Sequence, residues 1–429
     1  MDRDTEKGEK TMERASEKQI ENWIDGMDRF NATPEFGTTR IVFTKPDLQN
    51  REYVKEEMKK IGLEVKEDAI GNIYGILKGE NPTLAPVWTG SHIDTVPNAG
   101  KFDGMAGVVC GMEAARLIQK SKRRHERDII VIAYTSEEPT RYRLGCLGSR
   151  AMSGDMTLED TKYIYDLDGR SLYEKLKELN YDLDRFEEIQ RKKGDVYASV
   201  ELHIEQNNRL EKAGIPIGLV TNICAPSDYL VEVTGVQSHA GGTDMDERRD
   251  AYAAACEMAL ALERIAKECQ SVFNTATVGS VKVVPDAVNV IPGKCIFTVD
   301  IRDCTMETKL DTIEKFKAEF EKIAASRGVT VSIKEQNNDE PLISNETILE
   351  MLEDGCKELN LPYMRMISGP FHDSLFVGRF APTAMIFVPS KEGISHSPKE
   401  WTDFSFIAQG ADVLTNTLLR LANEKKVLE

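Results

Sequence analysis

The chain has 429 residues, of which 41% are hydrophobic and 30% are charged, so it is long enough for two domains with sizeable cores. Its formal net charge of −17 argues against nucleic acid and anionic membranes as partners, and no apolar run is long enough to predict a membrane span. The charged N-terminal stretch and the eight scattered cysteines, which form no CxxC pair, favour a cytoplasmic location over secretion.

The first part of the chain alternates predicted helices and strands. In chain order we expect helices over 12–33 and 46–62, strands over Asn72–Leu77 and Pro86–Gly90, a buried helix over Gly104–Lys120 and a strand over Asp128–Tyr134. The helices show apolar residues at three- and four-residue steps, and the strands are mostly apolar. Apolar strands that alternate with helices indicate an α/β sheet covered on both faces.

Residues 216–334 have a different pattern. The expected elements are strand Tyr229–Val236, helix Arg249–Glu268, strands Thr275–Val284 and Cys295–Ile301, helix Glu307–Arg327 and strand Val329–Ile333. Two helices on one antiparallel sheet form a ferredoxin-like α+β pattern. A helix over 347–359 and a buried strand over 384–388 then resume the first pattern. We therefore expect residues 216–334 to be a domain inserted between residues 1–215 and 335–429.

The histidines are the sharpest clue to function. The chain has only six, and His125 lies in a charged, solvated loop. The other five lie beside turn residues or acids, at strand ends or in loops, where ligands and catalytic groups are usually mounted: His92, His203, His239, His372 and His396. Each alone is more often an ordinary structural histidine, but five in such settings favour a functional site.

The stretch after the apolar run Pro86–Gly90 predicts a metal ligand and its support. His92 and Asp94 are expected on the same side of the strand end. Asp94 is then placed to accept the second ring N–H of His92, which would orient a metal-bound imidazole. Asp103 comes just before the next predicted helix, where it is either a ligand or the N-cap of that helix.

Adjacent carboxylates follow the next strand. Glu137 and Glu138 come shortly after Tyr134, the last residue of the predicted strand. Their side chains are expected to point in different directions, so one can bind metal while the other serves as a general base. A surface acidic turn is the alternative. His203 stands at another strand end, and His396 lies in a loop after strand 384–388.

In order, the motifs H-x-D, D-G-x-x-G, E-E, H-I-E-Q and S-H-S-P resemble the hydantoinase/carbamoylase branch of the aminoacylase and carboxypeptidase metallohydrolase superfamily, over residues 72–421. H-I-E-Q at 203–206 favours this amidase branch over the peptidases. Ser136–Thr140, Cys146–Arg150 and Phe371–Phe376 are most similar to ureidoglycolate amidohydrolases, with allantoate amidohydrolases and N-carbamoyl-L-amino-acid hydrolases as close relatives.

The resemblance implies an α/β, zinc-peptidase-like catalytic domain that holds two divalent metal ions. Ligand type alone does not choose between Zn²⁺ and Mn²⁺. The implied metal ligands are His92, Asp103, Glu138, His203 and His396. Asp103 would bridge the two ions. Glu137 would be the general base that takes a proton from water and passes it to the leaving nitrogen, and Asp94 would support His92.

The same resemblance makes the inserted α+β (ferredoxin-like) domain a lid and dimerisation domain, and so implies a homodimer. His239 would donate to the developing oxyanion in the neighbouring subunit's site; an exposed hairpin histidine is the alternative. Asn289 and Arg302 would hold the substrate carboxylate, for which the planar fork of arginine is well suited. Arg302 could instead form an ordinary ion pair with Asp300 or Asp303.

Gln206 and His372 are further candidates for substrate contact. Two stretches depart from the pattern of the relatives: Ala240–Met245 lacks their proline and adds a carboxylate, and Tyr142–Leu144 places a bulky cation where many have glycine. These departures bear on the substrate and leave the implied metal ligands intact.

The expected function is a binuclear amidohydrolase that cleaves the C–N bond of a small anionic ureido (N-carbamoyl) acid, such as ureidoglycolate, allantoate or an N-carbamoyl-L-amino acid. An aminoacylase or dipeptidase on the same fold is the nearest alternative. The others are a metal-binding or interaction protein without activity, and a structural α/β protein whose motifs are coincidental. The last would leave the proposed ligands scattered in space.

Overall fold

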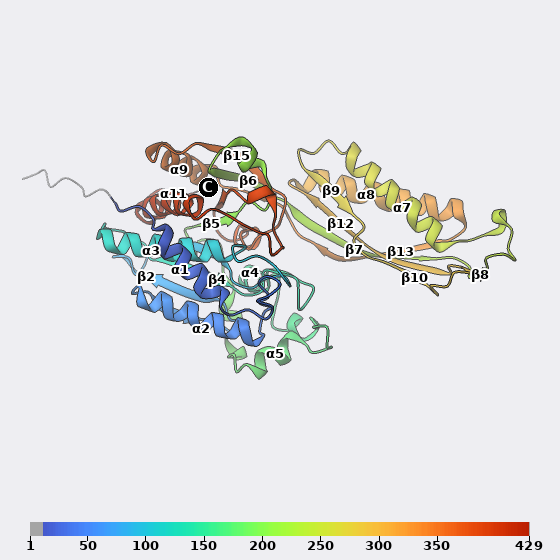
Figure 1. Cartoon of the computed structure of the whole chain (residues 1–429), viewed down its shortest axis with the longest axis horizontal. Coiled ribbons are helices and arrows are strands. Elements are labelled where there is room, and N and C mark those ends of the chain that lie inside the picture. Colours follow the sequence, from blue (N-terminus) through green and yellow to red (C-terminus); the bar gives the residue numbers. More distant parts are fainter. Residues whose placement is uncertain (1–11, 429) are drawn as a thin grey trace, which may run out of the picture. The chain divides into compact units, whose positions relative to one another are not determined.

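The computed structural model describes residues 12–428, which divide into two compact units (Figure 1). Unit 1 contains the residues up to 221, residues 344–366 and those from 372 onward, and unit 2 contains 222–343 and 367–371. We expected the inserted domain to begin at 216, but 217–221 belong to strand β6 (Ile217–Ile223), which pairs with the sheet of unit 1. Unit 2 also runs past 334, because β13 (Thr330–Asn338) continues beyond that point.

The strands of the larger sheet are β1 (Glu64–Glu67), β2 (Ile73–Leu77), β3 (Val87–His92), β4 (Ile129–Tyr134), β5 (Ala198–Ile204), β6, β14 (Leu342–Ile343), β15 (Tyr363–Ser368) and β16 (Thr383–Val388). Their order is β1-β2-β4-β3-β5-β16-β6-β14, with β15 paired to β6. The four central strands β4, β3, β5 and β16 run parallel, and β1, β2 and β6 pair antiparallel at the edges. Parallel strands end at one edge of the sheet, where ligand sites form in open α/β folds.

The helices of unit 1 are α1 (Glu17–Asp28), α2 (Lys45–Lys60), α3 (Met105–Ser121), α4 (Leu147–Ser153), α5 (Leu172–Glu178), α6 (Arg209–Ala213), α9 (Glu346–Glu358), α10 (Ser374–Val377) and α11 (Phe404–Asn423). Helix α1 begins at Glu17 rather than 12, because the Ser16 hydroxyl caps it by accepting the Gln19 N–H, a contact worth about 1 kcal/mol.

Two cores cover the two faces of the larger sheet, and strand β4 shows how the sequence divides between them. Ile129 and Val131 pack into the core that α1, α2, α3, α9 and α11 cover. Ile130 and Ile132 point the other way, into the core beneath α4 and α5. Because successive strand residues face opposite sides, a fully apolar strand serves both cores, which confirms the predicted α/β sheet covered on both faces.

Helix α3 lies close against the sheet at a glycine. A Cβ at Gly107 would lie 2.3 Å from the Leu202 carbonyl oxygen of β5, so only glycine permits this approach. The contact brings the residues just before α3 next to the end of β5. The small-residue spacing of this helix in the sequence therefore has a structural reason, namely the placement of the loop that carries Asp103.

Unit 2 is a smaller α+β unit. Its elements are β7 (Ala225–Thr234), β8 (Ser238–His239), α7 (Ala251–Glu268), β9 (Asn274–Thr277), β10 (Val281–Val284), β11 (Val290–Ile291), β12 (Lys294–Asp303), α8 (Met306–Arg327) and β13. The antiparallel sheet has the order β10-β12-β7-β13, with β9 also on β12. Helices α7 and α8 lie side by side over it (Figure 1). Aromatic side chains such as Phe316 and Phe320 belong to the core between the helices and the sheet.

One expected strand of unit 2 is divided. The sequence predicts a single strand over Thr275–Val284, but β9 and β10 pair separately with the two ends of β12. The pairing lapses around Gly279 and Ser280, where the Ser280 N–H donates to the Thr298 hydroxyl. Glycine weakens a strand because it has no side chain to pack, so the break falls where the sequence is least able to continue the ladder. Among the described residues, no helix combines the length and apolar character needed to cross a membrane.

Candidate metal centre

Four segments from distant parts of the chain meet at the carboxyl edge of the parallel strands. His92 is the last residue of β3, and His203 is the last but one of β5. Glu137 and Glu138 follow β4, and His396 lies in the loop after β16. Because these strands are neighbours in the sheet, their ends bring the side chains together.

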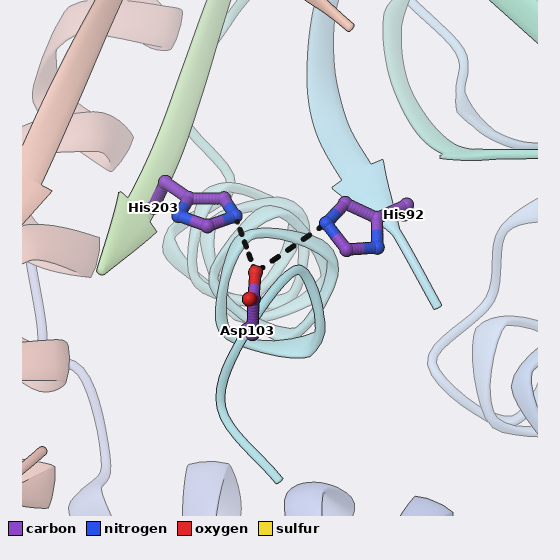
Figure 2. A group of neighbouring side chains, drawn as sticks. All are labelled: His92, Asp103 and His203. Carbon is purple, nitrogen blue, oxygen red and sulfur yellow. Dashed lines mark ion pairs between the residues drawn. The ribbon is translucent and has the colours of Figure 1, made fainter. Parts of the chain in front are cut away.

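Asp103 and two buried histidines form the first group. The Asp103 Oδ1 atom lies 3.1 Å from His203 Nε2 and 3.5 Å from His92 Nε2. Figure 2 shows both rings turning an edge toward this carboxylate from the two strand ends. All three residues are buried, and one potential ligand atom from each lies within 4.8 Å of the others.

The second group uses the other oxygen of the same carboxylate. Asp103 Oδ2 lies 3.0 Å from His396 Nε2, which is in turn 3.2 Å from Glu138 Oε1. Asp103 therefore belongs to both groups. Gly104 makes room for this arrangement: its φ of 72° is left-handed, and a Cβ there would lie 2.5 Å from the His92 ring.

The hydrogen bonds of the two buried histidines indicate that their Nε2 atoms, which face Asp103, are suited to bind a cation. His92 Nδ1 donates to the Asp94 main-chain carbonyl at 3.0 Å, and His203 Nδ1 donates to the Ile204 carbonyl at 2.9 Å. The Gly104 N–H donates to His203 Nε2 at 3.2 Å, so this nitrogen presents a lone pair. A lone pair that faces a carboxylate oxygen at 3.1 Å needs a cation between them. Three imidazoles and two carboxylates fit Zn²⁺ or Mn²⁺.

The electrostatics of the cluster also favour cations. Burial opposes ionisation of the Asp103 carboxyl, but the adjacent rings of His203, His396 and His92 hold its pKa well below the usual value. Hydrogen bonds to Asp103 and Glu138 raise the pKa of His396 to about 11. The site thus gathers carboxylate oxygens in a buried place, where their ionised form is stable only beside positive charge.

Glu137 stands beside the two groups without belonging to either. Its Oε2 atom lies 3.9 Å from His92 Nε2, and the side chain is buried. Burial raises the pKa of Glu137 well above its ordinary value; the charge of Glu138 adds to the rise, and His92 opposes it. A carboxylate that is close to the ligands, buried and not itself shared has the placement of a general base.

Asp94 supports the site differently from our expectation. We expected its carboxylate to accept the second ring N–H of His92, but that oxygen is 3.7 Å away and the main-chain carbonyl takes the hydrogen bond. The carboxylate instead accepts the N–H groups of Glu137 and Glu138, each at 3.2 Å. Ser136, the residue just before them, has a left-handed φ of 56°, which residues other than glycine rarely adopt without tertiary support.

The other interpretations of these residues can now be judged. Asp103 is not the side-chain cap of α3, because Gly104 occupies the N-cap and no side chain caps the helix. Glu137 and Glu138 are buried, so they do not form a surface acidic turn. The unit 1 residues predicted for the site converge, which excludes scattered, coincidental motifs.

Known proteins share this architecture. The family described as Peptidase family M20/M25/M40 matches residues 88–420. The chain belongs to this family. Ureidoglycolate hydrolase of Oryza sativa subsp. japonica is 39% identical, over 94% of this chain and 84% of its own length. N-carbamoyl-L-amino acid amidohydrolase of Geobacillus stearothermophilus is 38% identical, over 91% of this chain and 94% of its own.

A solved structure gives the same result. AtUAH in complex with glyoxylate is 37% identical and aligns with a TM-score of 0.86, covering 96% of this chain and 98% of that one. These findings confirm the resemblance to the amidase branch and the expected fold. This M20 protein is an amidohydrolase that acts on non-peptide C–N bonds.

Two further candidates in the M20 site differ in their placement. Gln206 Nε2 donates to Asp103 Oδ2 at 2.9 Å. The Gln206 Oε1 atom is buried and accepts no hydrogen bond from residues 12–428. His372 is buried against the His203 ring, with 4.5 Å between ring centroids. Burial, with the nearby His203, lowers the pKa of His372 well below its usual value, so its imidazole stays neutral.

Sequence reasoning missed several acids behind the candidate metal ligands. Glu201 accepts from the Ser91 hydroxyl at 2.7 Å and from the Ser374 hydroxyl at 2.6 Å. Asp373 accepts from the Ser149 hydroxyl at 2.5 Å, which joins the segments 146–150 and 371–376 that carried the resemblance. Burial raises the pKa of Asp373 to about 8, with Glu201 adding to the shift. The spacing of Glu201 two residues before His203 is the signal that could have found the first of them.

Glu400 is the most informative of the missed residues. Its Oε1 atom accepts the N–H groups of Phe102 and Asp103, at 3.0 and 3.1 Å. Its Oε2 atom accepts the Ser395 hydroxyl at 2.8 Å, and the same hydroxyl lies 3.2 Å from Asp103 Oδ2. Burial and then the charge of Asp103 raise the pKa of Glu400 to about 7. Glu400 thus ties the loop of Asp103 to the loop of His396.

We expect Glu400→Gln to weaken metal binding by roughly 10–100-fold, the usual cost of losing a partner that orients a ligand. A glutamine cannot accept at both ends, so it cannot hold both loops as the carboxylate does. Competition with a chromophoric chelator measures the affinity. Glu392→Gln, on the same loop but exposed, is the matched control and should be unchanged. Equal metal affinity in the two variants would contradict a positioning role. A lower metal affinity of Glu400→Gln that is accompanied by a lower melting temperature of its apo-protein would also contradict it, because general destabilisation would then explain the loss.

The remaining candidates belong to unit 2. His239 and Asn289 are brought together, because β8 pairs with β11 and the Ala240 N–H donates to the Asn289 carbonyl. Both are exposed. The Gly241 N–H donates to His239 Nδ1 at 3.0 Å, so the ring proton of the neutral imidazole lies on Nε2 and points outward. Arg302, on β12, forms the ion pair with Asp300 that we had named as its alternative role, at 2.9 Å.

Proposed function

We propose that this protein is a two-metal amidohydrolase that removes the carbamoyl group of a small ureido (N-carbamoyl) acid, with ureidoglycolate as the first substrate to test. The observation that carries the proposal is the sharing of the Asp103 carboxylate between two groups of ligand atoms. The names of the relatives support the substrate class: ureidoglycolate hydrolase, N-carbamoyl-L-amino acid amidohydrolase and allantoate amidohydrolase.

The proposed ligands of one ion are His92, Asp103 and His203, and those of the other are Asp103, Glu138 and His396. Zn²⁺ and Mn²⁺ both suit this donor set. When bound, such a pair lowers the pKa of water and polarises a carbonyl group. Hydrolysis of a ureido group requires both effects, because its carbonyl is a poor electrophile and water is a poor nucleophile. Asp94 and Glu400 would hold the ligand loops in place through the hydrogen bonds described above.

Glu137 would be the general base. Its carboxylate takes a proton from the attacking water and delivers it to the leaving nitrogen, so that the C–N bond breaks to an amine rather than to an amide anion. Hydrolysis consumes one water molecule and releases ammonia and carbon dioxide from the ureido group. The low solvent exposure of Glu137 keeps it from exchanging that proton freely with bulk water.

Unit 2 would supply the contacts to the anionic end of the substrate, as an inserted lid and dimerisation domain. His239 presents an outward N–H and would donate to the oxyanion in the neighbouring subunit of a homodimer. Asn289 and Arg302 would hold the substrate carboxylate, with Gln206 and His372 as further contacts. The eight cysteines of the chain are all free thiols in the structure, which supports the proposed cytoplasmic location.

Arg302→Ala is expected to raise KM for an anionic ureido acid by at least about tenfold, since a charge-assisted pair is lost, while metal content stays unchanged. Arg302 Nε and Nη2 face Asp300, so removing the guanidinium also frees an acid that repels the substrate. Steady-state kinetics with metal analysis check this. Arg327→Ala, which removes an exposed ion pair on the same unit, is the control. Unchanged KM in Arg302→Ala would exclude it from the site.

The deciding experiment is a substrate panel with added Mn²⁺ or Zn²⁺. Ureidoglycolate, allantoate, N-carbamoyl-β-alanine and several N-carbamoyl-L-amino acids are compared by ammonia release. N-acetyl amino acids and dipeptides are included to represent the aminoacylase and dipeptidase alternatives. Turnover of a ureido acid alone supports the proposal, and turnover confined to acetylated amino acids or dipeptides overturns it.

A further inference from the structure

Phe371 stands next to two of the proposed substrate contacts. The centroid of its ring lies 5.8 Å from the guanidinium carbon of Arg302. His372 is the next residue in the chain, so its Cα atom is about 3.8 Å from that of Phe371. The His372 ring in turn packs against the ring of the candidate ligand His203, with 4.5 Å between centroids. A substrate that pairs with Arg302 and reaches the metal centre therefore passes beside Phe371.

Phe371 and Arg302 both have surface that a ligand can touch. Phe371 is only partly buried, whereas His372 is fully buried. The side chain of Arg302 is 31% exposed. Its Nε and Nη2 atoms donate to Asp300, and in the part of the chain that the structure describes its Nη1 atom makes no hydrogen bond. An apolar ring and a guanidinium edge with free N–H groups are thus available to the same small molecule.

The segment that carries Phe371 is held in place on both sides. Before it, the Ser368 hydroxyl donates to the Pro370 carbonyl at 2.7 Å. Gly369 lies so close to Phe273 that a Cβ there would be 2.7 Å from the Phe273 ring. After it, the chain enters the buried start of helix α10. A ring on a fixed segment leaves a fixed amount of space beside it, because packed side chains yield little to an added group.

The candidate substrates share one frame and differ at one position. Ureidoglycolate, allantoate and the N-carbamoyl-L-amino acids each carry a carboxylate and a ureido group on the same carbon atom. The third substituent of that carbon is a hydroxyl, a second ureido group or an amino-acid side chain. When Arg302 holds the carboxylate and the metal centre holds the ureido carbonyl, the two shared groups are fixed. The space left for the third substituent then decides which of these acids fits.

We propose that Phe371 is a specificity-determining residue, whose ring limits the third substituent to a small group. The protein then favours ureidoglycolate, which carries a hydroxyl at this position, over N-carbamoyl amino acids with large side chains. The guanidinium of Arg302 lies within the range of a cation–π contact with the ring and helps to keep it in this place. This inference rests on the proposed function, because it assumes the substrate orientation given there.

The test compares kcat/KM for N-carbamoyl-L-phenylalanine with kcat/KM for N-carbamoylglycine, in the full-length, metal-loaded protein. We expect Phe371→Ala to raise this ratio by at least about tenfold, since even one methylene group in a close-fitting site changes kcat/KM by that factor or more. Phe371→Leu should give a smaller rise. Phe273→Ala is the matched control, because it removes a ring that supports the same segment at Gly369, and it should leave the ratio unchanged. Circular dichroism confirms that each variant is folded.

An unchanged ratio in Phe371→Ala overturns the proposal, as does an equal rise in Phe273→Ala or a wild type that prefers N-carbamoyl-L-phenylalanine. Failure of the proposed function has a different signature. If the wild type cleaves only N-acetyl amino acids or dipeptides, the same ratio is measured with N-acetyl-L-phenylalanine and N-acetylglycine, and the size limit at Phe371 is judged on that result. If no substrate is turned over, the ratio of binding affinities for the two N-carbamoyl acids, measured by calorimetry, decides in the same way.

Discussion

Glu137→Gln is expected to lower kcat by about 10²–10⁴-fold, the usual contribution of a general base, while metal content stays at the wild-type level. The amide has the same shape as the carboxylate and cannot accept the proton. Glu137 belongs to neither group of ligand atoms, so the ions should remain. Kinetics with the best substrate of the panel and elemental analysis of the same preparation measure the two quantities.

Glu138→Gln is the matched control, because it changes the neighbouring residue in the same way. Glu138 belongs to the group with Asp103 and His396, so this variant should lose metal as well as activity. The pH profile separates the roles further. The base acts only when ionised, so the wild-type rate rises with pH through the pKa of Glu137, and the residual rate of Glu137→Gln should lack that rise. If Glu137→Gln keeps more than a tenth of the wild-type kcat, another residue must be the general base.

Asp103→Asn is expected to remove both ions and to reduce turnover by roughly 10³-fold or more, since several kcal/mol of charge stabilisation are lost. Each oxygen of Asp103 faces a different group, so no other single substitution reaches both. An asparagine offers one neutral oxygen and one NH2 group, whose N–H dipoles repel a cation. Metal content, turnover and the rise in melting temperature on adding Zn²⁺ or Mn²⁺ are measured; binding to the native state raises it.

His396→Ala is the control for Asp103→Asn. It removes a ligand from one group only and leaves His92, Asp103 and His203 in place. This variant should keep about half of the metal, and its melting temperature should still rise when metal is added, whereas that of Asp103→Asn should not. Equal metal content in the two variants would show that Asp103 is not shared between two ions. Full metal content in Asp103→Asn would remove it from the centre.

The sequence predicted the parts of the site that local pattern encodes. Apolar runs followed at once by polar residues marked the ends of β3, β4 and β5, and these ends carry His92, Glu137, Glu138 and His203. The alternation of strands and helices predicted the α/β sheet, and the change of pattern after 216 predicted a second unit near its observed position. Such features depend on residue periodicity and turn residues, which are properties of short stretches.

The division of Asp103 between two groups, the role of the Asp94 main chain and the contribution of Glu400 were decided by the tertiary structure. Asp103 and Glu400 are 297 positions apart, and no local pattern connects them. Ser136, Gln206 and His396 adopt left-handed backbone conformations that side chains other than glycine rarely take without support from their surroundings. The sequence by itself therefore determined which residue types reach the strand ends. The packing of distant loops determined which atoms face one another. Loop conformation depends on contacts between segments far apart in the chain, and no local pattern encodes those contacts.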